Sequence, residues 1–156
     1  NVIIGNTCLY CATGGILYAA GRAGERFGVR NSGAMAVVEG LGDHGCEYMT
    51  GGIVLILGET GRNFGAGMTG GRAYVLDRAR VFERRVNLEL VELHRLEGQE
   101  DIDNVRTLLE RHFVATKSNL ALELLTNWDD VQELFWMVVP RGAGAKLEQV
   151  VSAKEG

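Results

Sequence analysis

Cysteine and histidine residues are the first candidates for chemistry in this sequence. Cys8-x-x-Cys11 and, further along, His44-x-Cys46 supply the thiol and imidazole groups that a tetrahedral zinc ion takes as ligands. Cys46, with His44 and Glu47 beside it, could instead form a nucleophile and base pair. Both hypotheses require the fold to bring these side chains together, so both depend on how the strands and turns that carry these residues are arranged.

Two glycine patterns match the dinucleotide-binding fingerprint, namely Gly40-x-Gly42-x-x-Gly45 and Gly65-x-Gly67-x-x-Gly70. Glu59 lies near the spacing expected of the acidic residue that binds a ribose. The fingerprint works only where a helix N-terminus receives the pyrophosphate. Here the motifs are followed by Gly51-Gly52 and Gly70-Gly71, which disfavour a helix. We therefore expect no cofactor-binding site at either pattern.

The glycine-rich half of the chain is a repeat. A three-residue motif recurs in steps of 18, 19 and 19 residues, as Thr13-Gly14-Gly15, Asn31-Ser32-Gly33, Thr50-Gly51-Gly52 and Thr69-Gly70-Gly71. A short apolar run follows each copy of this motif. This period is close to one coil of a β-solenoid. An open sandwich is the alternative, but its strands recur every 8–12 residues.

Glycine permits the positive φ angles that solenoid corners require. We predict that thirteen glycines turn these corners, and they are Gly14, Gly15, Gly21, Gly24, Gly28, Gly33, Gly51, Gly52, Gly58, Gly61, Gly65, Gly70 and Gly71. The fold class expected is mainly β, a single-stranded solenoid with coils of about 18–19 residues and helices after it.

The repeat register tests the zinc hypothesis. Cys8 and Cys11 precede the first copy of the motif, whereas His44 and Cys46 precede the third copy, two coils later. Two coils are separated by about 9.6 Å, since neighbouring strands lie about 4.8 Å apart, and a Zn–S bond is about 2.3 Å long. We therefore predict no metal site and no disulfide to Cys46, with the cysteines acting as small buried apolar side chains. The sequence places no third group that would support a Cys46–His44 pair, so we also predict no catalytic residue.

The remaining polar and aromatic candidates receive structural interpretations. Asp43, His44 and four arginines are expected on a solvated or partner-facing side, the arginines being Arg22, Arg26, Arg30 and Arg62. His94 and His112 lack an evident ligand partner. The three large aromatic residues of the C-terminal half, Trp128, Phe135 and Trp136, are expected to anchor a core or an interface.

The second half predicts one strand and then helices. A strand is expected over 88–93, a helix over 102–113 with Asp101 as its N-cap, and a helix behind Ser118. Asp129 and Asp130 predict a third short helix through Phe135, ending before Pro140. We divide the chain into a glycine-rich solenoid, 1–95, and a helical cap and tail, 96–156. The helices are expected to cover the last coil.

Composition excludes several classes of protein. The chain has 156 residues, a mass of 17.0 kDa, a net charge of −4 and a pI near 5.4. These values argue against nucleic acid or an anionic membrane as a partner. An odd count of three cysteines indicates reduced thiols in a cytosol-like compartment. Because it starts at Asn1 with a strand-like run, we expect the chain to be a piece of a longer protein.

At the glycine-rich half the sequence resembles a known family. The strings that carry the resemblance include Gly5-Asn6-Thr7-Cys8-Leu9-Tyr10, Ala23-Gly24-Glu25-Arg26-Phe27, Gly42-Asp43-His44-Gly45-Cys46-Glu47-Tyr48-Met49-Thr50-Gly51-Gly52 and Gly67-Met68-Thr69-Gly70-Gly71. They are similar to the C-terminal GXGXG domain of the glutamate synthase large subunit. Cys11 stands where this family usually has glycine, which would destabilise a corner with positive φ.

The resemblance implies a right-handed β-helix with a non-catalytic, structural role beside the amidotransferase and FMN-barrel domains of the same enzyme. It implies that FMN and an iron–sulfur cluster belong to that parent enzyme and that this segment holds neither. The implied location is the cytoplasm, or the plastid stroma of a photosynthetic eukaryote. The alternative is a separately encoded scaffold subunit of an oxidoreductase, as in formylmethanofuran dehydrogenase. Self-association through the uncapped N-terminal coil is also expected.

Overall fold

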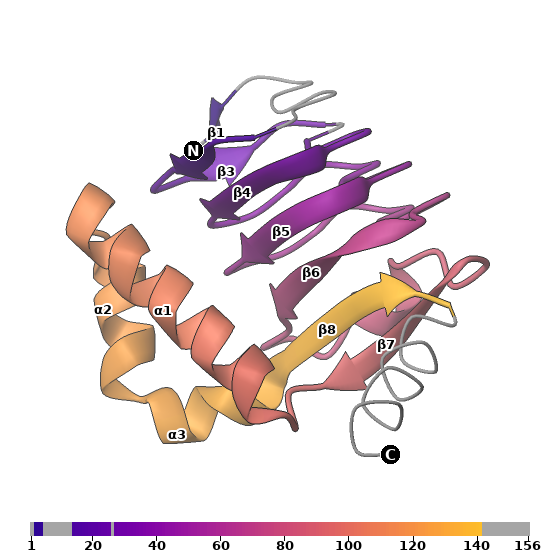
Figure 1. The fold of residues 1–156 in the computed structure, drawn as a ribbon. Coiled ribbons are helices and arrows are strands. Elements are labelled where there is room, and N and C mark those ends of the chain that lie inside the picture. The colour runs from indigo at the N-terminus through magenta and orange to yellow at the C-terminus, as the bar shows by residue number, and fades with distance from the viewer. Residues whose placement is uncertain (1, 5–13, 26, 142–156) are drawn as a thin grey trace, which may run out of the picture.

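The computed structural model describes residues 2–4, 14–25 and 27–141, and the side chains of residues 14–25 and 27–141. Six strands form one sheet in the order β2-β4-β5-β6-β8-β7 (Figure 1). They are β2 (Ile16–Tyr18), β4 (Ser32–Val38), β5 (Thr50–Ile56), β6 (Gly70–Leu76), β8 (Phe135–Pro140) and β7 (Val91–Arg95). A second, two-stranded sheet pairs β1 (Val2–Ile4) with β3 (Arg22–Ala23).

The first four strands of the large sheet are parallel, and each is one coil further along the chain. Ala36 of β4 faces Val54 of β5, which faces Ala73 of β6. These partners are 18 and 19 residues apart, so the spacing between paired residues matches the period of the sequence repeat. Parallel pairing of successive strands at this spacing is a β-solenoid, which confirms the predicted fold class.

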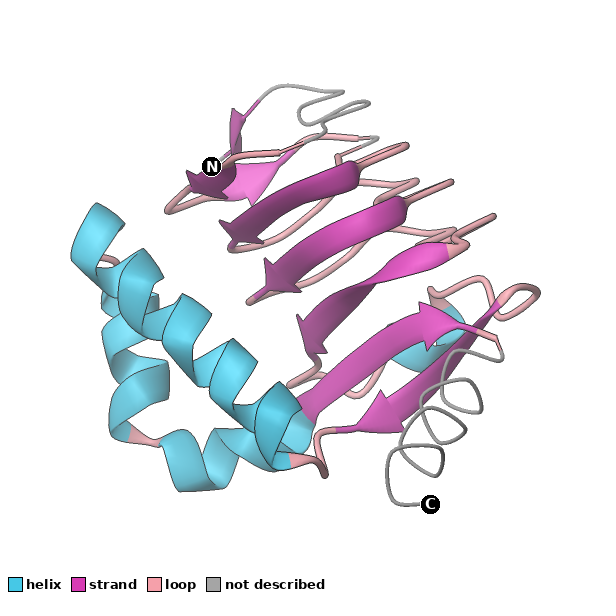
Figure 2. Cartoon of the chain, in the orientation of Figure 1, coloured by secondary structure: helices cyan, strands magenta, loops and turns pink. Residues whose placement is uncertain are grey.

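The chain after the solenoid forms three α-helices, α1 (Gln99–Thr116), α2 (Asn119–Thr126) and α3 (Trp128–Val131), which lie together beside the sheet (Figure 2). Ser118 caps α2 as predicted, since its side chain accepts a hydrogen bond from the Ala121 N–H. The predicted N-cap of α1 was wrong. Gly98 is the N-cap, and Asp101 lies within the first turn, where its carboxylate binds residues of β6 instead.

The last strand, β8, was not predicted. The third helix is short: it ends at Val131, a 3-10 turn (Gln132–Leu134) follows, and Phe135 begins a strand. β8 pairs antiparallel with β6 on one side and β7 on the other. The open edge of the last coil is therefore covered by a strand, while the helices pack on a face of the sheet. The predicted strand over 88–93 begins instead at Val91, and another 3-10 turn (Phe82–Arg84) precedes it.

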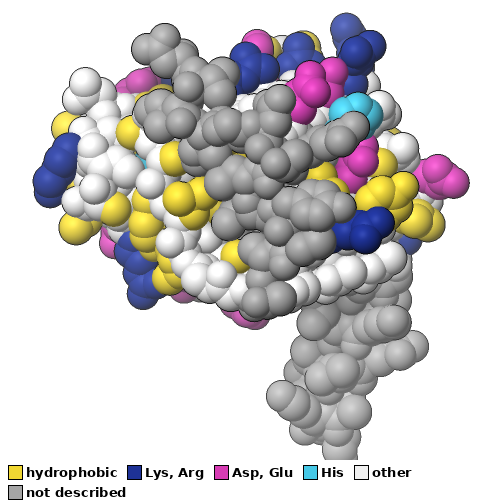
Figure 3. Space-filling model, turned by 90° about the horizontal axis from the view of Figure 1, so that it is seen from above, with side chains coloured by type: hydrophobic (Ala, Val, Ile, Leu, Met, Phe, Trp, Pro, Cys, Tyr) yellow, Lys and Arg dark blue, Asp and Glu magenta, His cyan; other side chains and the backbone are white. Residues whose placement is uncertain are grey.

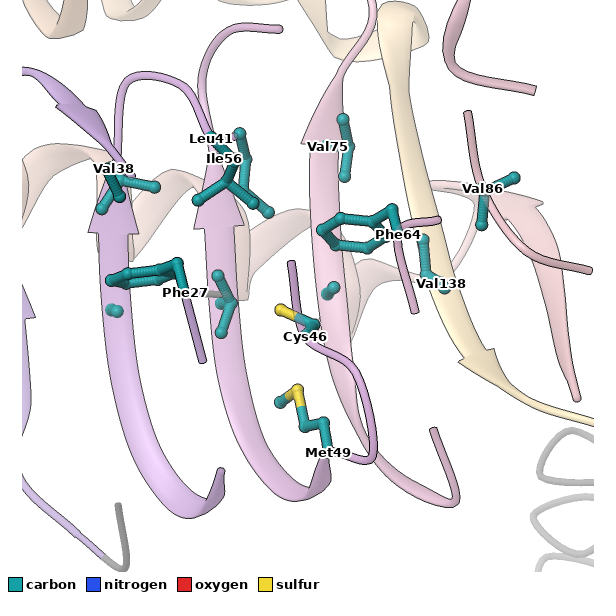
Figure 4. Close-up of a cluster of buried hydrophobic side chains, with 14 of the residues drawn as sticks. Phe27, Val38, Leu41, Cys46, Met49, Ile56, Phe64, Val75, Val86 and Val138 are labelled. Carbon is teal, nitrogen blue, oxygen red and sulfur yellow. The ribbon is translucent and has the colours of Figure 1, made fainter. Parts of the chain in front are cut away.

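Successive side chains along each strand point to opposite faces of the sheet, so the apolar ones are divided between two cores. Val54 and Ile56 of β5 point into the solenoid, whereas Leu55 packs against the helices. Figure 4 shows the inner core, where Phe27, Cys46 and Phe64 from the turns meet the strand side chains. The outer core joins Leu55 and Tyr74 to apolar residues of the helices, among them Val105, Leu108, Leu109, Leu124 and Trp128.

Candidate functional site

His44 and Cys46 lie in the turn between β4 and β5, not on a strand. We call residues 44–48 the arc, because left-handed residues alternate along it. His44, Cys46 and Tyr48 have φ angles of 64°, 56° and 55°. The coils on either side repeat the pattern at Gly28 and Arg30, and at Asn63, Gly65 and Gly67. A left-handed φ costs a residue with a Cβ roughly 1–2 kcal/mol. The arc therefore has side chains at three positions where glycine would adopt the same backbone conformation at a lower cost in free energy.

Backbone hydrogen bonds hold the arc between the equivalent turns of the two neighbouring coils. The N–H of His44 donates to Arg62 O at 2.9 Å and that of Tyr48 to Ala66 O at 2.8 Å, both in the next coil. The Cys46 N–H donates in the opposite direction, to Phe27 O at 2.8 Å. Because N–H groups point alternately up and down, the turns form a continuous ladder that fixes their unusual φ angles.

The Cys46 thiol is not arranged as a nucleophile. It is fully buried in the inner core, and burial raises its pKa to about 12, so it stays protonated at neutral pH. The His44 side chain is turned to Glu47, with Nδ1 and Oε1 2.5 Å apart. Cys8 and Cys11 lie outside the described residues. Among the residues that the structure describes, no group of three or more His, Cys, Asp or Glu side chains is placed to hold a metal ion.

Neither glycine fingerprint leads into a helix. The chain enters β5 at Thr50 after the first and β6 at Gly70 after the second. Gly45 has a packing role instead, since a Cβ there would lie 2.7 Å from Leu41 Cδ1 and 3.2 Å from the Phe64 ring. Gly45 thus leaves room in the inner core for Leu41 of the same coil and Phe64 of the next coil.

The predicted corner glycines differ in what they do. Gly15, Gly28, Gly52, Gly65 and Gly71 have left-handed φ angles. Others lie where two coils touch: a Cβ on Gly51, Gly58 or Gly70 would overlap a carbonyl oxygen of the preceding coil, and one on Gly61 would overlap Asp43. Gly14 is exposed, and a Cβ there would meet no atom within 4 Å. Gly21 and Gly24 each accept a backbone hydrogen bond from the next coil, and Gly33 lies in β4.

Two polar clusters attach the helices to the solenoid. In the first, Glu39 Oε2 lies 3.1 Å from His112 Nε2 and accepts a 3.1 Å hydrogen bond from Ser118 Oγ. His112 is completely buried, and its Nδ1 has no hydrogen-bond partner in residues 14–25 and 27–141. In the second, Asp101 Oδ1 accepts 2.7 Å hydrogen bonds from Tyr74 Oη and Arg72 Nη1. Sequence reasoning missed both clusters, because their members are 27 to 79 residues apart.

The aromatic residues anchor cores, as their types suggested. Trp128 and Phe135 pack together in the outer core with ring centroids 6.0 Å apart. The Arg95 guanidinium stacks on Trp136 at 3.5 Å from the ring centroid, and the indole N–H donates to Asp77. His94 Nε2 lies 3.1 Å from the Glu92 carboxylate. These contacts tie β7 and β8 to the turn that follows β6.

The arginines expected on a solvated side are exposed wherever the structure describes them. Arg30 and Arg62 are exposed, and the Arg62 N–H donates a 2.7 Å hydrogen bond to Asp43, a bond that holds the pKa of that carboxyl below its usual value. Arg22 is also exposed, and its guanidinium donates a 2.8 Å hydrogen bond to Leu41 O. Arg26 lies outside the described residues.

A cavity of about 190 Å³ lies beside the turns that follow β5 and β6. Its lining is mostly apolar and includes Leu57, Val75 and Phe82, together with Thr60. Thr60 is 3% exposed, and its hydroxyl has no hydrogen-bond partner among the residues that the structure describes. In the described part of the chain, no helix is long and apolar enough to cross a membrane.

Comparison with known proteins gives one consistent result. A family model described as "GXGXG motif" matches residues 1–141. The glutamate synthase [NADPH] large chain of Bacillus subtilis (strain 168) is 50% identical over 155 residues, which cover 99% of this chain and 10% of that protein.

Ferredoxin-dependent relatives are equally similar. Ferredoxin-dependent glutamate synthase 2 of Synechocystis sp. is 53% identical over 140 residues, 90% of this chain and 9% of that protein. The chloroplastic ferredoxin-dependent glutamate synthase of Spinacia oleracea is 49% identical over 156 residues, 96% of this chain and 10% of that protein. The chain thus spans about a tenth of the length of these curated relatives.

Proposed function

The chain belongs to the GXGXG-motif family, and we propose that it serves as a structural, non-catalytic domain of a glutamate synthase large chain. The observation that carries this proposal is near-complete coverage of the chain, at about 50% identity, by proteins roughly ten times longer. The solenoid gives such a domain a rigid body, because every coil is hydrogen-bonded to its neighbours through both its strand and its turn.

The chemistry in this proposal belongs to the rest of the large chain. The parent enzyme would transfer ammonia released from glutamine to 2-oxoglutarate and reduce the adduct to glutamate, using FMN and an iron–sulfur cluster held elsewhere. This domain would pack against the amidotransferase and FMN-barrel domains. We place the protein in the cytoplasm, or in the plastid stroma if its source is photosynthetic. The buried Cys46 thiol and the Glu47-bound His44 support a non-catalytic role.

The mass of the native polypeptide tests the proposal directly. An antibody raised against residues 14–141 is used to blot a cell extract. We expect a band about ten times heavier than 17.0 kDa, given the share of the relatives that the chain covers. A band near 17.0 kDa would instead support a separately encoded scaffold subunit and would overturn the proposal.

A second experiment tests the non-catalytic role. The full-length chain carrying Cys46→Ala is compared with the unmodified enzyme for glutamate formation from glutamine and 2-oxoglutarate. We expect kcat to stay within about twofold, because an inert buried thiol contributes only packing. A loss of about a hundredfold or more in a folded variant would show that Cys46 takes part in catalysis.

A further inference from the structure

A groove of about 610 Å³ lies where the turn after β6, the end of β7 and the chain from α3 to β8 come together. Its volume falls within the range of about 300–1,000 Å³ that is usual for small-molecule sites. Four exposed charged residues are part of its lining, and they are Arg80, Arg95, Asp129 and Glu133. Figure 1 places the elements of the groove at the end of the molecule opposite to β1.

These four charges are unpaired. Within residues 14–25 and 27–141, none of them forms an ion pair. The neighbouring Arg78, by contrast, is paired, since its Nη2 lies 2.9 Å from Glu123 Oε1. The groove therefore presents two cations and two anions that do not neutralise one another, and a ligand that carries both charges can bind between them.

One of the two guanidinium groups is already fixed in place. Arg95 stacks on Trp136 at 3.5 Å from the ring centroid, and the indole N–H donates a 3.2 Å hydrogen bond to the Asp77 carboxylate. That carboxylate also accepts two backbone N–H groups of its own turn, and the Asp77 N–H donates to Leu134 O across the groove at 3.0 Å. Stacking uses the face of the guanidinium. Apart from one long bond of 3.5 Å to Phe135 O, its N–H edge stays available for a carboxylate.

Exposed charges of both signs are not in themselves a site. Figure 3 views the opposite end of the molecule, over the first coils, and basic and acidic side chains lie near each other there too. The groove differs because its charges are unpaired, line one hollow and include a guanidinium whose position is set before any ligand arrives.

We propose that this groove binds an α-amino acid as its zwitterion. Arg80 and Arg95 would bind the ligand carboxylate, and Asp129 and Glu133 its ammonium group. A ligand with only one of these charges would leave half of the groove's charges without a partner. Leu96, which is 8% exposed, offers an apolar surface to the carbon chain of the ligand. The proposal goes beyond the structural role proposed above and does not depend on it, because the charges of the groove carry it.

Titration of the purified 156-residue chain with L-glutamine tests the site. The carboxamide of this ligand can also form a hydrogen bond with the amide of Gln132, which lines the groove. The indole N–H signal of Trp136 in a ¹H–¹⁵N NMR spectrum is the readout, because Arg95 stacks on that ring. We expect a saturable shift with a Kd of about 1 mM or below. No shift, or a shift that does not saturate by about 50 mM, would overturn the proposal.

Two analogues of L-glutamine test whether both charges are recognised. Glutaramate lacks the ammonium group, and 4-aminobutanamide lacks the carboxylate. We expect each to bind at least about tenfold more weakly than L-glutamine, because each loses its charge-assisted hydrogen bonds to one side of the groove. An analogue that binds as tightly as L-glutamine would show that the groove does not recognise a zwitterion.

Charge-removing variants locate the site. Arg80→Gln and Glu133→Gln each remove one charge from the groove. The matched controls are Arg84→Gln and Asp130→Asn, at exposed positions outside its lining. We expect the affinity for L-glutamine to fall about fivefold or more in the first pair and to change less than about twofold in the controls. Urea denaturation checks that every variant is folded. Unchanged affinity in both groove variants would place the binding elsewhere and refute the site.

Discussion

Tyr74 Oη donates a 2.7 Å hydrogen bond to Asp101 Oδ1, joining the middle of β6 to the first turn of α1 across 27 residues. Arg72 Nη1 donates to the same oxygen at 2.7 Å. The pKa of Tyr74 is raised to about 12, first by burial and then by the hydrogen bond that its hydroxyl donates to the Asp101 carboxylate. Tyr74 therefore stays a neutral donor throughout the physiological range and fixes where α1 begins to cover the sheet.

Removing this hydrogen bond should weaken the fold. We expect Tyr74→Phe to lower the free energy of unfolding by about 1.5–3 kcal/mol, the usual contribution of a hydrogen bond to a charged acceptor. Urea denaturation of the purified protein gives the value. Tyr18→Phe is the matched control, since the half-buried Tyr18 packs near His112 and makes no comparable hydrogen bond to a described residue. Equal losses in both variants would show that the Asp101 contact is energetically neutral.

Two glycine positions should respond very differently to alanine. A Cβ on Gly70 would overlap the Thr50 carbonyl oxygen, whereas one on Gly14 would have open space. We expect Gly70→Ala to cost about 1–3 kcal/mol or more, because parallel coils must separate, and Gly14→Ala to change stability by less than about 0.5 kcal/mol. Thermal unfolding monitored by circular dichroism makes the comparison. A Gly70→Ala variant as stable as Gly14→Ala would contradict this account of the coil contact.

The Cys46 thiol should make stability depend on pH in the alkaline range. Its pKa is about 12 in the folded chain, against 9.0 for an exposed thiol. Above pH 9 the unfolded chain loses this proton first, so the contribution of Cys46 is complete below pH 9 and is lost as pH rises towards 12. We expect Cys46→Ala to flatten that decline in unfolding free energy. Identical slopes between pH 8 and 10.5 would contradict the prediction.

Thr60→Val should stabilise the protein. The Thr60 hydroxyl is buried beside an apolar cavity and has no hydrogen-bond partner in the described part of the chain, and valine has nearly the same shape without the polar group. We expect a gain of about 1 kcal/mol in the free energy of unfolding, the lower end of the penalty for an unsatisfied hydroxyl. Thr69→Val, at an exposed threonine, is the control. A loss of stability in Thr60→Val alone would mean that the hydroxyl has a partner, such as bound water.

The repeat made most of the solenoid predictable. Parallel strands one coil apart place equivalent residues in register, so Val54 and Ala73 could be assigned to successive coils from spacing alone. The same register predicted that His44 and Cys46 lie two coils from Cys8 and Cys11, a prediction that stays untested because both of those cysteines lie outside the described residues. The period is a property of the linear sequence, and in a solenoid each coil contacts mainly the coils next to it along the chain.

Long-range pairing was beyond such reasoning. β8 reads as the end of a helix, because its apolar run is too short to distinguish helix from strand. It becomes a strand because β6 and β7 offer it unpaired backbone groups on both sides. Asp101 has the residue type of an N-cap, but Tyr74 and Arg72 bind its carboxylate, and Gly98 is the N-cap of α1 instead.

The sequence by itself determined the coil period, the glycine-rich turns and the family, since each depends on residues that recur at fixed spacing or on strings found in relatives. The tertiary structure alone decided the left-handed φ angles of Arg30 and Tyr48, the pairing of Glu39 with His112, and the return of β8 to the sheet. The physical reason is that these features depend on groups brought together through space, which local spacing does not encode.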